Sequence, residues 1–363
     1  MKLMNRRDCL RGAVTLGAAA QLAGCKDLID VLGQACPEDP ADQGGIDWVP
    51  DVMFPVAAGF EDVDVAQGAP GPARIWYPTF EVFTEGGSAP LRILKHCLAR
   101  WPVVLFLHGD PPCSIPNYNR HWTTIPAELA RSGYVVVVPQ HDHAFPQDTS
   151  GVPFVSSFID WARNTWQHAR WTDKGPKAVA IAGHSYGALL GARVATLRSD
   201  ISACAFLSGP WSELNDRDAL LRGLGRPTFY MFATDELFEN VNDQGLWDSF
   251  DYPKYAAEFD GNHFDYITQP PGCGKPVGSC GLIKSVAADL VTLFLSRYLG
   301  IGASRTDINV DLVPPAAPFT SGKQQFFGAS RLSGLEEIKN AHGCSVDLKW
   351  KDGAEAGSRH LGP

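Results

Sequence analysis

Residues 178–192 read AVAIAGHSYGALLGA. The apolar run Ala178–Ala182 is typical of a strand buried on both faces, and the small residues of Ala188–Thr196 predict a helix packed closely on the sheet. Between them, Gly183-His184-Ser185-Tyr186-Gly187 forms a sharp strand-to-helix turn. Glycine on both sides of the serine is required because the turn strains the serine backbone and leaves no room for a Cβ atom. The turn therefore predicts a nucleophile, Ser185. The alternative is a glycine-rich turn with an incidental serine.

The rest of the chain alternates strand-like and helix-like segments. Apolar runs without polar alternation predict buried parallel strands, and the amphipathic segments between them predict covering helices. The expected strands are 62–66, 74–77, 103–107, 134–138, 178–182, 203–207 and 229–233, and the expected helices are 122–132, 155–170, 188–196 and 282–299. Together they predict a mostly parallel central sheet with helices on both faces. The Gly-x-Ser-x-Gly turn in this context resembles the nucleophile elbow of the α/β-hydrolases, so the α/β-hydrolase fold is expected.

That resemblance implies a chain order of serine, acid and histidine. Of the histidines after Ser185, His263 lies in a short loop (Gly-Asn-His-Phe-Asp) before the last helix, whereas His342 and His360 lie in an irregular tail. His263 is therefore the expected base. Asp235 follows the strand 229–233 and is the expected acid, with Glu236, Asp216 and Asp218 as rivals.

Acyl transfer also requires donors for an oxyanion. The backbone N–H of Tyr186, directly after the nucleophile, is the first expected donor. The second is the N–H of Asp110 in the loop His108-Gly109-Asp110-Pro111-Pro112, because proline has no N–H. Trp211 and His108 are expected to line the substrate pocket; the alternative is simple packing for Trp211 and, for His108, a structural role that ties its loop down. Only residues 209–226 separate two expected strands, so a large lid is not expected there.

Several further motifs resemble one particular group within the α/β-hydrolases. Arg74-Ile75-Trp76-Tyr77-Pro78, the His-Gly loop, 132–139 (SGYVVVVP) and Gly-Asn-His-Phe-Asp resemble the platelet-activating-factor acetylhydrolase, dienelactone hydrolase and chlorophyllase group. The resemblance spans about residues 62–299. It implies hydrolysis of a small-molecule carboxylic ester without a metal or organic cofactor. The dienelactone enzymes use cysteine where this chain has Ser185, so the resemblance extends to reaction class and not to substrate.

The N-terminus has the organisation of an export signal. Basic residues (Lys2, Arg6, Arg7, Arg11) precede the apolar residues 12–24, and Arg6-Arg7 resembles a twin-arginine signal. Leu22-Ala23-Gly24-Cys25 resembles a lipobox, in which Cys25 would carry the lipid; an ordinary signal with an incidental cysteine is the alternative. We therefore expect a periplasmic or cell-surface protein that contacts the membrane only through this anchor.

The expected organisation is a signal at 1–24, a tether at 25–51, a catalytic domain at 52–300 and an irregular extension at 301–363. Of nine cysteines, Cys9 would be removed and Cys25 lipidated, which leaves an odd number. Cys204 lies in an apolar run and is expected to be buried and free. Cys273 and Cys280, which enclose a short Gly/Pro-rich loop, are the expected disulfide pair in an oxidising compartment.

Charge and motif composition exclude several other classes. A net charge of −9 on 363 residues argues against a general nucleic-acid binder. Gln140-His141-Asp142-His143 resembles a set of metal ligands, but without a distant partner, pocket lining or loop anchoring is the preferred role. Two functional alternatives stay open: an acyltransferase or peptidase with the same triad, and a non-catalytic binding lipoprotein with this fold.

Overall fold

The computed structural model describes residues 57–79, 100–110, 115–142, 149–235, 244–250, 253–267, 282–299 and 348–352. All helices and strands below belong to one compact unit of the chain, Val49–Leu94 with Trp101–Pro363. Outside the described residues lie the predicted signal at 1–24 and the whole tether at 25–51 with Cys25, as well as Glu236, Cys273, Cys280, His342 and His360.

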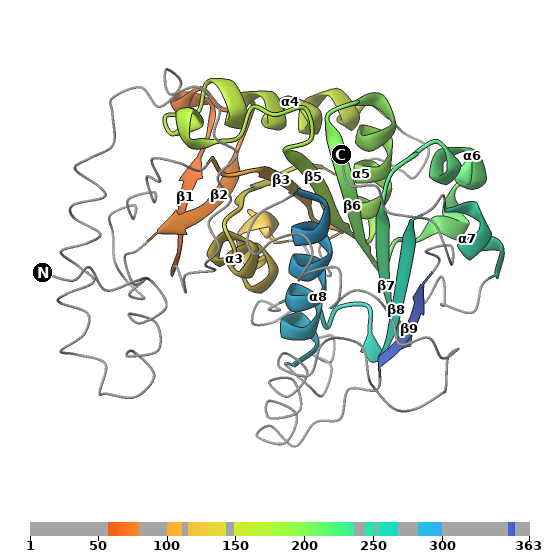
Figure 1. The fold of residues 1–363 in the computed structure, drawn as a ribbon. Coiled ribbons are helices and arrows are strands. Elements are labelled where there is room, and N and C mark those ends of the chain that lie inside the picture. Colours follow the sequence, from red (N-terminus) through yellow and green to blue (C-terminus); the bar gives the residue numbers. More distant parts are fainter. Residues whose placement is uncertain are drawn as a thin grey trace, which may run out of the picture. The chain divides into compact units, whose positions relative to one another are not determined.

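The described residues form one nine-stranded sheet, in the order β1-β2-β4-β3-β5-β6-β7-β8-β9 (Figure 1). Strands β4, β3, β5, β6, β7 and β8 run parallel, while β1, β2 and β9 pair antiparallel. The strands are β1 (Ala57–Val63), β2 (Ala73–Thr79), β3 (Val103–Leu107), β4 (Val135–Pro139), β5 (Val179–His184), β6 (Ile201–Leu207), β7 (Thr228–Asp235), β8 (Lys254–Asn262) and β9 (Leu348–Asp352).

Helices lie on both faces of this sheet. The helices α4 and α5 pack together on one face, and α3 and α8 pack together on the other (Figure 1). The α-helices are α3 (Thr124–Arg131), α4 (Gly151–Asn164), α5 (Tyr186–Leu197), α6 (Arg217–Arg222), α7 (Gln244–Ser249) and α8 (Leu282–Leu299). Short 3₁₀ helices are η2 (Val65–Gln67), η3 (Tyr118–His121), η4 (Ala169–Trp171) and η5 (Trp211–Glu213).

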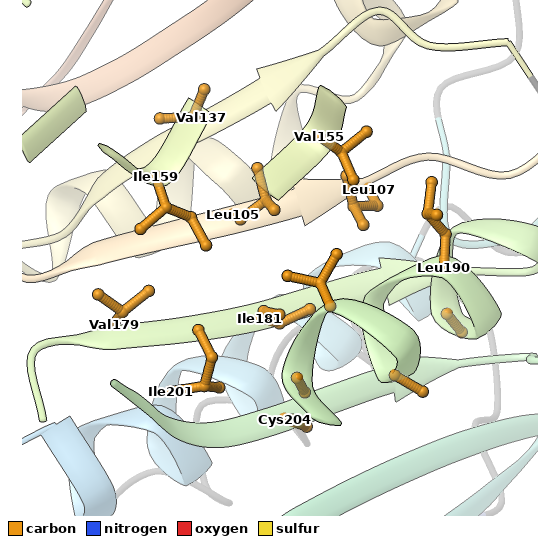
Figure 2. Packing of buried hydrophobic residues seen from close by; sticks show 14 of the residues in the cluster. Leu105, Leu107, Val137, Val155, Ile159, Val179, Ile181, Leu190, Ile201 and Cys204 are labelled. Atoms are coloured by element: carbon orange, nitrogen blue, oxygen red, sulfur yellow. The ribbon is translucent and has the colours of Figure 1, made fainter. Parts of the chain in front are cut away.

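The parallel strands divide their side chains between two cores. In β3, Leu105 and Leu107 join the core under α4 and α5, whereas Val104 and Phe106 join the core under α3 and α8. Figure 2 shows the first core, where Leu105 and Ile181 face Ile159 of α4 and Leu190 of α5. This two-sided burial explains why the strands lack polar alternation in the sequence.

The α/β-hydrolase fold predicted from the sequence is confirmed, with corrections at several elements. β3 and α8 have the predicted bounds. The strand predicted at 62–66 is instead β1, ending at Val63, because the Asp64 side chain accepts the Ala66 N–H and caps η2. The helix predicted at 155–170 begins earlier and ends at Asn164. α7 and β9 were not predicted, and β9 departs from the irregular extension expected at 301–363.

Between β6 and β7 the chain forms only η5 and the six-residue helix α6, in agreement with the absence of a large lid there. Among the described helices, none has the length and apolar character needed to cross a bilayer.

Candidate active site

The nucleophile turn is strained and tightly packed. Ser185 separates β5 from α5 and has φ 54°, in the left-handed region that residues other than glycine rarely adopt. Its backbone N–H donates to the carbonyl of Leu207 in β6 at 2.9 Å. A Cβ atom on Gly183 would lie 2.5 Å from the Gly187 carbonyl oxygen, and one on Gly187 would collide with the carbonyl oxygens of Leu107 and His108. Both glycines of the motif are therefore sterically required.

The His-Gly loop after β3 lies directly against this turn. A Cβ atom on Gly109 would be 2.5 Å from the Cβ of Ser185. The carbonyl oxygen of Gly109 lies 2.9 Å from Nδ1 of His108, which must therefore carry the proton and donate. In a trans peptide the C=O and N–H point in opposite directions, so this hydrogen bond directs the Asp110 N–H away from the His108 ring.

His108 holds the loop through its contact with Gly109, which is the structural role given above as the alternative to pocket lining. Its side chain is fully buried. The ring stacks on the buried ring of His141 with centroids 4.1 Å apart and planes 14° apart, and it meets the edge of Tyr118 at 5.3 Å. These contacts fix the plane of the His108 ring. They therefore also fix the position of Nδ1, which donates to the Gly109 carbonyl.

Trp211 also differs from its expected pocket role, because it belongs to the core. It is fully buried and packs against Phe206 and Phe250, with ring centroids 5.3 and 5.8 Å away. A large aromatic side chain gains most free energy when it leaves water completely, so packing prevails here over exposure in a pocket.

Tyr186 follows the nucleophile and remains partly exposed. Its hydroxyl donates to the Glu213 carboxylate of η5 at 2.8 Å. Partial burial, this hydrogen bond and the Glu213 charge raise the pKa of Tyr186 to about 12, so the phenol stays neutral. The backbone N–H of Tyr186 lies at the start of α5, where helix N–H groups have no carbonyl partner within the helix.

His263 lies one residue beyond β8 and is buried. Hydrogen bonds hold the turn around it: Asn262 Oδ1 accepts the Phe264 N–H at 2.9 Å, and Asp265 Oδ2 accepts the Asn262 N–H at 2.9 Å. The ring of His263 lies 4.7 Å, centroid to centroid, from the ring of His184, the residue directly before Ser185. The structure therefore brings the residues at 184 and 263 together.

Asp235 is the last residue of β7, and its backbone pairs in register with Asn262 of β8. The predicted acid therefore ends the strand next to β8, and it pairs with the residue directly before the predicted base, His263. Two rivals point elsewhere: Asp216 pairs with Arg193 at 3.1 Å, and Asp218 bonds to Ser249 and Arg217. Asp216 and Asp218 are exposed and bonded to these partners, and the assignment of Asp235 as the acid stays a prediction.

His184 belongs to the predicted motif, but no role was predicted for it from the sequence. Its Nε2 lies 2.8 Å from the backbone carbonyl oxygen of His263, and its side chain is completely buried. The available signal was a polar residue at the end of an otherwise apolar buried strand, where a hydrogen-bond partner is required.

Among the described residues, no three His, Cys, Asp or Glu side chains gather as metal ligands. His141 of the metal-like stretch is buried against His108, and His143 lies outside the described residues. Cys204 is buried and free, as predicted, and burial raises the pKa of its thiol to about 12.

Comparison with known protein families gives one finding that agrees with this geometry. Residues 104–269 match the model of the alpha/beta hydrolase family, a range that contains Asp110, Ser185, Asp235 and His263. The match supports placing the chain in the α/β-hydrolase superfamily and supports a hydrolase activity. No curated protein matched the chain.

Proposed function

We propose that this protein is a serine hydrolase that cleaves carboxylic esters through an acyl-enzyme. The observation that carries the proposal is the strained Ser185, which packs against Gly109 of the His-Gly loop and directly follows His184, whose ring neighbours that of His263. A strained serine at the end of a central parallel strand is the arrangement that presents a nucleophile in this fold.

In the proposed reaction, Ser185 Oγ attacks the ester carbonyl and its proton passes to His263. The carbonyl oxygen becomes an oxyanion that accepts hydrogen bonds from the N–H groups of Tyr186 and Asp110. His263 then gives the proton to the departing alcohol. Water, deprotonated by His263, releases the carboxylic acid and regenerates Ser185.

Asp235 would accept a hydrogen bond from the imidazole of His263, which selects the tautomer that faces Ser185 and stabilises the imidazolium. The register of Asp235 with Asn262 supports this role, because it sets the acid and the base on adjacent parallel strands. Within the superfamily, the platelet-activating-factor acetylhydrolase, dienelactone hydrolase and chlorophyllase group remains the one that the motifs favour.

A labelling experiment tests the nucleophile. A fluorophosphonate probe should label the wild type, and Ser185→Ala should abolish labelling and lower turnover of p-nitrophenyl acetate by about 10³- to 10⁶-fold. Ser157→Ala is the matched control, since this serine on α4 bonds only locally, to the Phe154 carbonyl. Labelling that survives in Ser185→Ala, or that is lost in Ser157→Ala, would contradict the assignment.

The same preparation separates hydrolysis from acyl transfer. Added methanol or glycerol competes with water for the acyl-enzyme, so a hydrolase should release mainly the free acid at low alcohol concentration. Predominant ester or peptide-bond exchange under these conditions would favour the acyltransferase or peptidase alternative. A chain that is never labelled would favour the binding lipoprotein.

We also propose that the protein is exported and anchored by lipid on Cys25. The basic start, the apolar segment and the lipobox-like sequence support this proposal. Metabolic labelling with an alkyne fatty acid should mark the wild type but not Cys25→Ala. Equal labelling of both forms would show that Cys25 is not the anchor.

A further inference from the structure

We infer that His184 is a positioning residue, which holds His263 against the nucleophile turn through a hydrogen bond from its Nε2–H to the backbone carbonyl of His263. The inference rests on the proposed function, because it gives His184 a part in the same site. Its basis is a contact of 2.8 Å between two buried groups. Since a carbonyl oxygen only accepts, Nε2 is the protonated nitrogen.

The ring of His184 has a fixed orientation. Three aromatic rings from two other segments surround it: Trp122 at 5.0 Å, and Tyr266 at 5.3 Å and His263 at 4.7 Å from the turn after β8, measured between centroids. A side chain without exposure and with neighbours on several sides keeps one rotamer. Its donor therefore stays aimed at the His263 carbonyl.

The bond joins the end of β5, directly before Ser185, to the turn that contains His263. His184 and Ser185 are consecutive, so the residue that holds His263 is covalently attached to the nucleophile. Local hydrogen bonds fix Asn262, Phe264 and Asp265 to one another, but they do not tie this turn to the turn at Ser185. The bond from His184 makes that link and restrains the distance between base and nucleophile.

His184 also remains uncharged beside a base that must become charged. Burial lowers the pKa of His184 well below its usual value, and the nearby His263 lowers it further, against the opposing effect of their hydrogen bond. A neutral donor can bind the His263 carbonyl throughout the reaction without repelling the imidazolium. A lysine or arginine at this position would supply a donor together with a destabilising charge.

Two substitutions of equal length test the inference. Glutamine places an amide N–H near the position of Nε2, whereas methionine fills similar space without a strong donor. We expect His184→Gln to keep kcat within about threefold, and His184→Met to lower kcat by about 10- to 100-fold with KM little changed, because misplacement of the base affects chemistry more than binding. If methionine prevents folding, His184→Asn replaces it, since the asparagine amide reaches only the position of Nδ1.

The melting temperature of each variant distinguishes positioning from a purely structural role. Equal kcat values for folded His184→Gln and folded His184→Met (or Asn) would overturn the inference, whether both variants are fast or both are slow. Ser185→Ala measured in parallel keeps the two claims apart. If Ser185→Ala remains active, the proposed function fails; if it is inactive while His184→Met matches the wild type, only the role of His184 fails.

Discussion

Ser185 and His263 both follow strands of one sheet, but their surroundings are of different kinds. Around Ser185 the restraint is steric, because Gly183, Gly187 and Gly109 each occupy a place where a Cβ atom would meet other atoms at 2.5 Å or less. Around His263 the restraint comes from hydrogen bonds, made by Asn262, Asp265 and the distant His184.

This difference determines how each half of the site should respond to mutation. Steric restraint is local and leaves a pattern of small residues in the sequence, so the nucleophile turn is sensitive to added volume. A hydrogen-bonded restraint depends on partners that are 79 positions apart, as for His184 and His263, and it is sensitive to lost donors or acceptors. The predictions below address the two halves separately.

The largest effect is expected on the hydrogen-bonded half. Asp235→Asn should lower kcat by about 10³- to 10⁴-fold, because an amide at this position favours the wrong tautomer of His263 while preserving shape. Ester turnover of the purified variant measures the loss, and its melting temperature should stay close to that of the wild type.

Asp218→Asn is the matched control for this change. Asp218 is exposed on α6 and bonds to Ser249 and Arg217, so its replacement should leave turnover nearly unchanged. A normal rate in Asp235→Asn, with the loss found instead in Asp265→Asn or Glu236→Gln, would transfer the role of acid to that residue.

A smaller effect is expected from added volume on the steric half. The new methyl group of Gly109→Ala would lie 2.5 Å from Ser185 Cβ, so the His-Gly loop must move away from the nucleophile. Because the Asp110 N–H moves with the loop, turnover should fall by about 100-fold. Steady-state kinetics should show the loss mainly in kcat.

Gly151→Ala provides the control for a glycine that has room for a side chain. At the start of α4, the nearest atom to a Cβ would be Leu190 Cδ1 at 3.9 Å, an ordinary contact. If Gly109→Ala and Gly151→Ala both retain full activity, the proposed steric restraint around Ser185 is wrong.

The same contrast explains which parts of the molecule could be predicted from sequence. β3 was predicted with its observed bounds because its apolar run is continuous and bounded by turn residues, and α8 because its apolar residues recur with the period of a helix. Ser185 and Gly187 were predictable because their steric requirements leave small residues nearby in the sequence. In contrast, β9 alternates apolar and charged residues, but nothing local in Leu348–Asp352 indicates that it pairs with β8.

Side-chain contacts between distant segments were the least predictable. Trp211 and His108 were expected to line a pocket, yet both are fully buried, because the sequence does not reveal that Phe250 and His141 cover them. The hydrogen bond from His184 to His263 is of the same kind. Its donor lies in the best-predicted motif of the chain, and its acceptor is a backbone atom, which every residue has.

The smallest expected effect is the contribution of His184, in the hydrogen-bonded half, to the pH dependence of the free energy of unfolding. Burial holds the pKa of His184 well below 6.5 in the folded protein, so the unfolded chain binds an extra proton when the pH falls below that value. The stabilisation is therefore complete above the unfolded pKa and decreases as the pH falls towards the folded pKa. Between about pH 7.5 and pH 5.5 this one group should lower the free energy of unfolding by an amount on the order of 1 kcal/mol.

Urea unfolding of the wild type and His184→Gln at both pH values isolates this contribution, because all other groups are common to the two proteins. The wild type should lose more free energy of unfolding than the variant, by an amount on the order of 1 kcal/mol. His121→Gln serves for comparison: partial burial and then the charge of Arg74 lower the pKa of His121, but this side chain is far less buried, so its replacement should change the pH dependence less. Identical decreases in the free energy of unfolding for the wild type and His184→Gln would mean that His184 is protonated in the folded protein. The inference that His184 is a neutral donor to His263 would then be wrong.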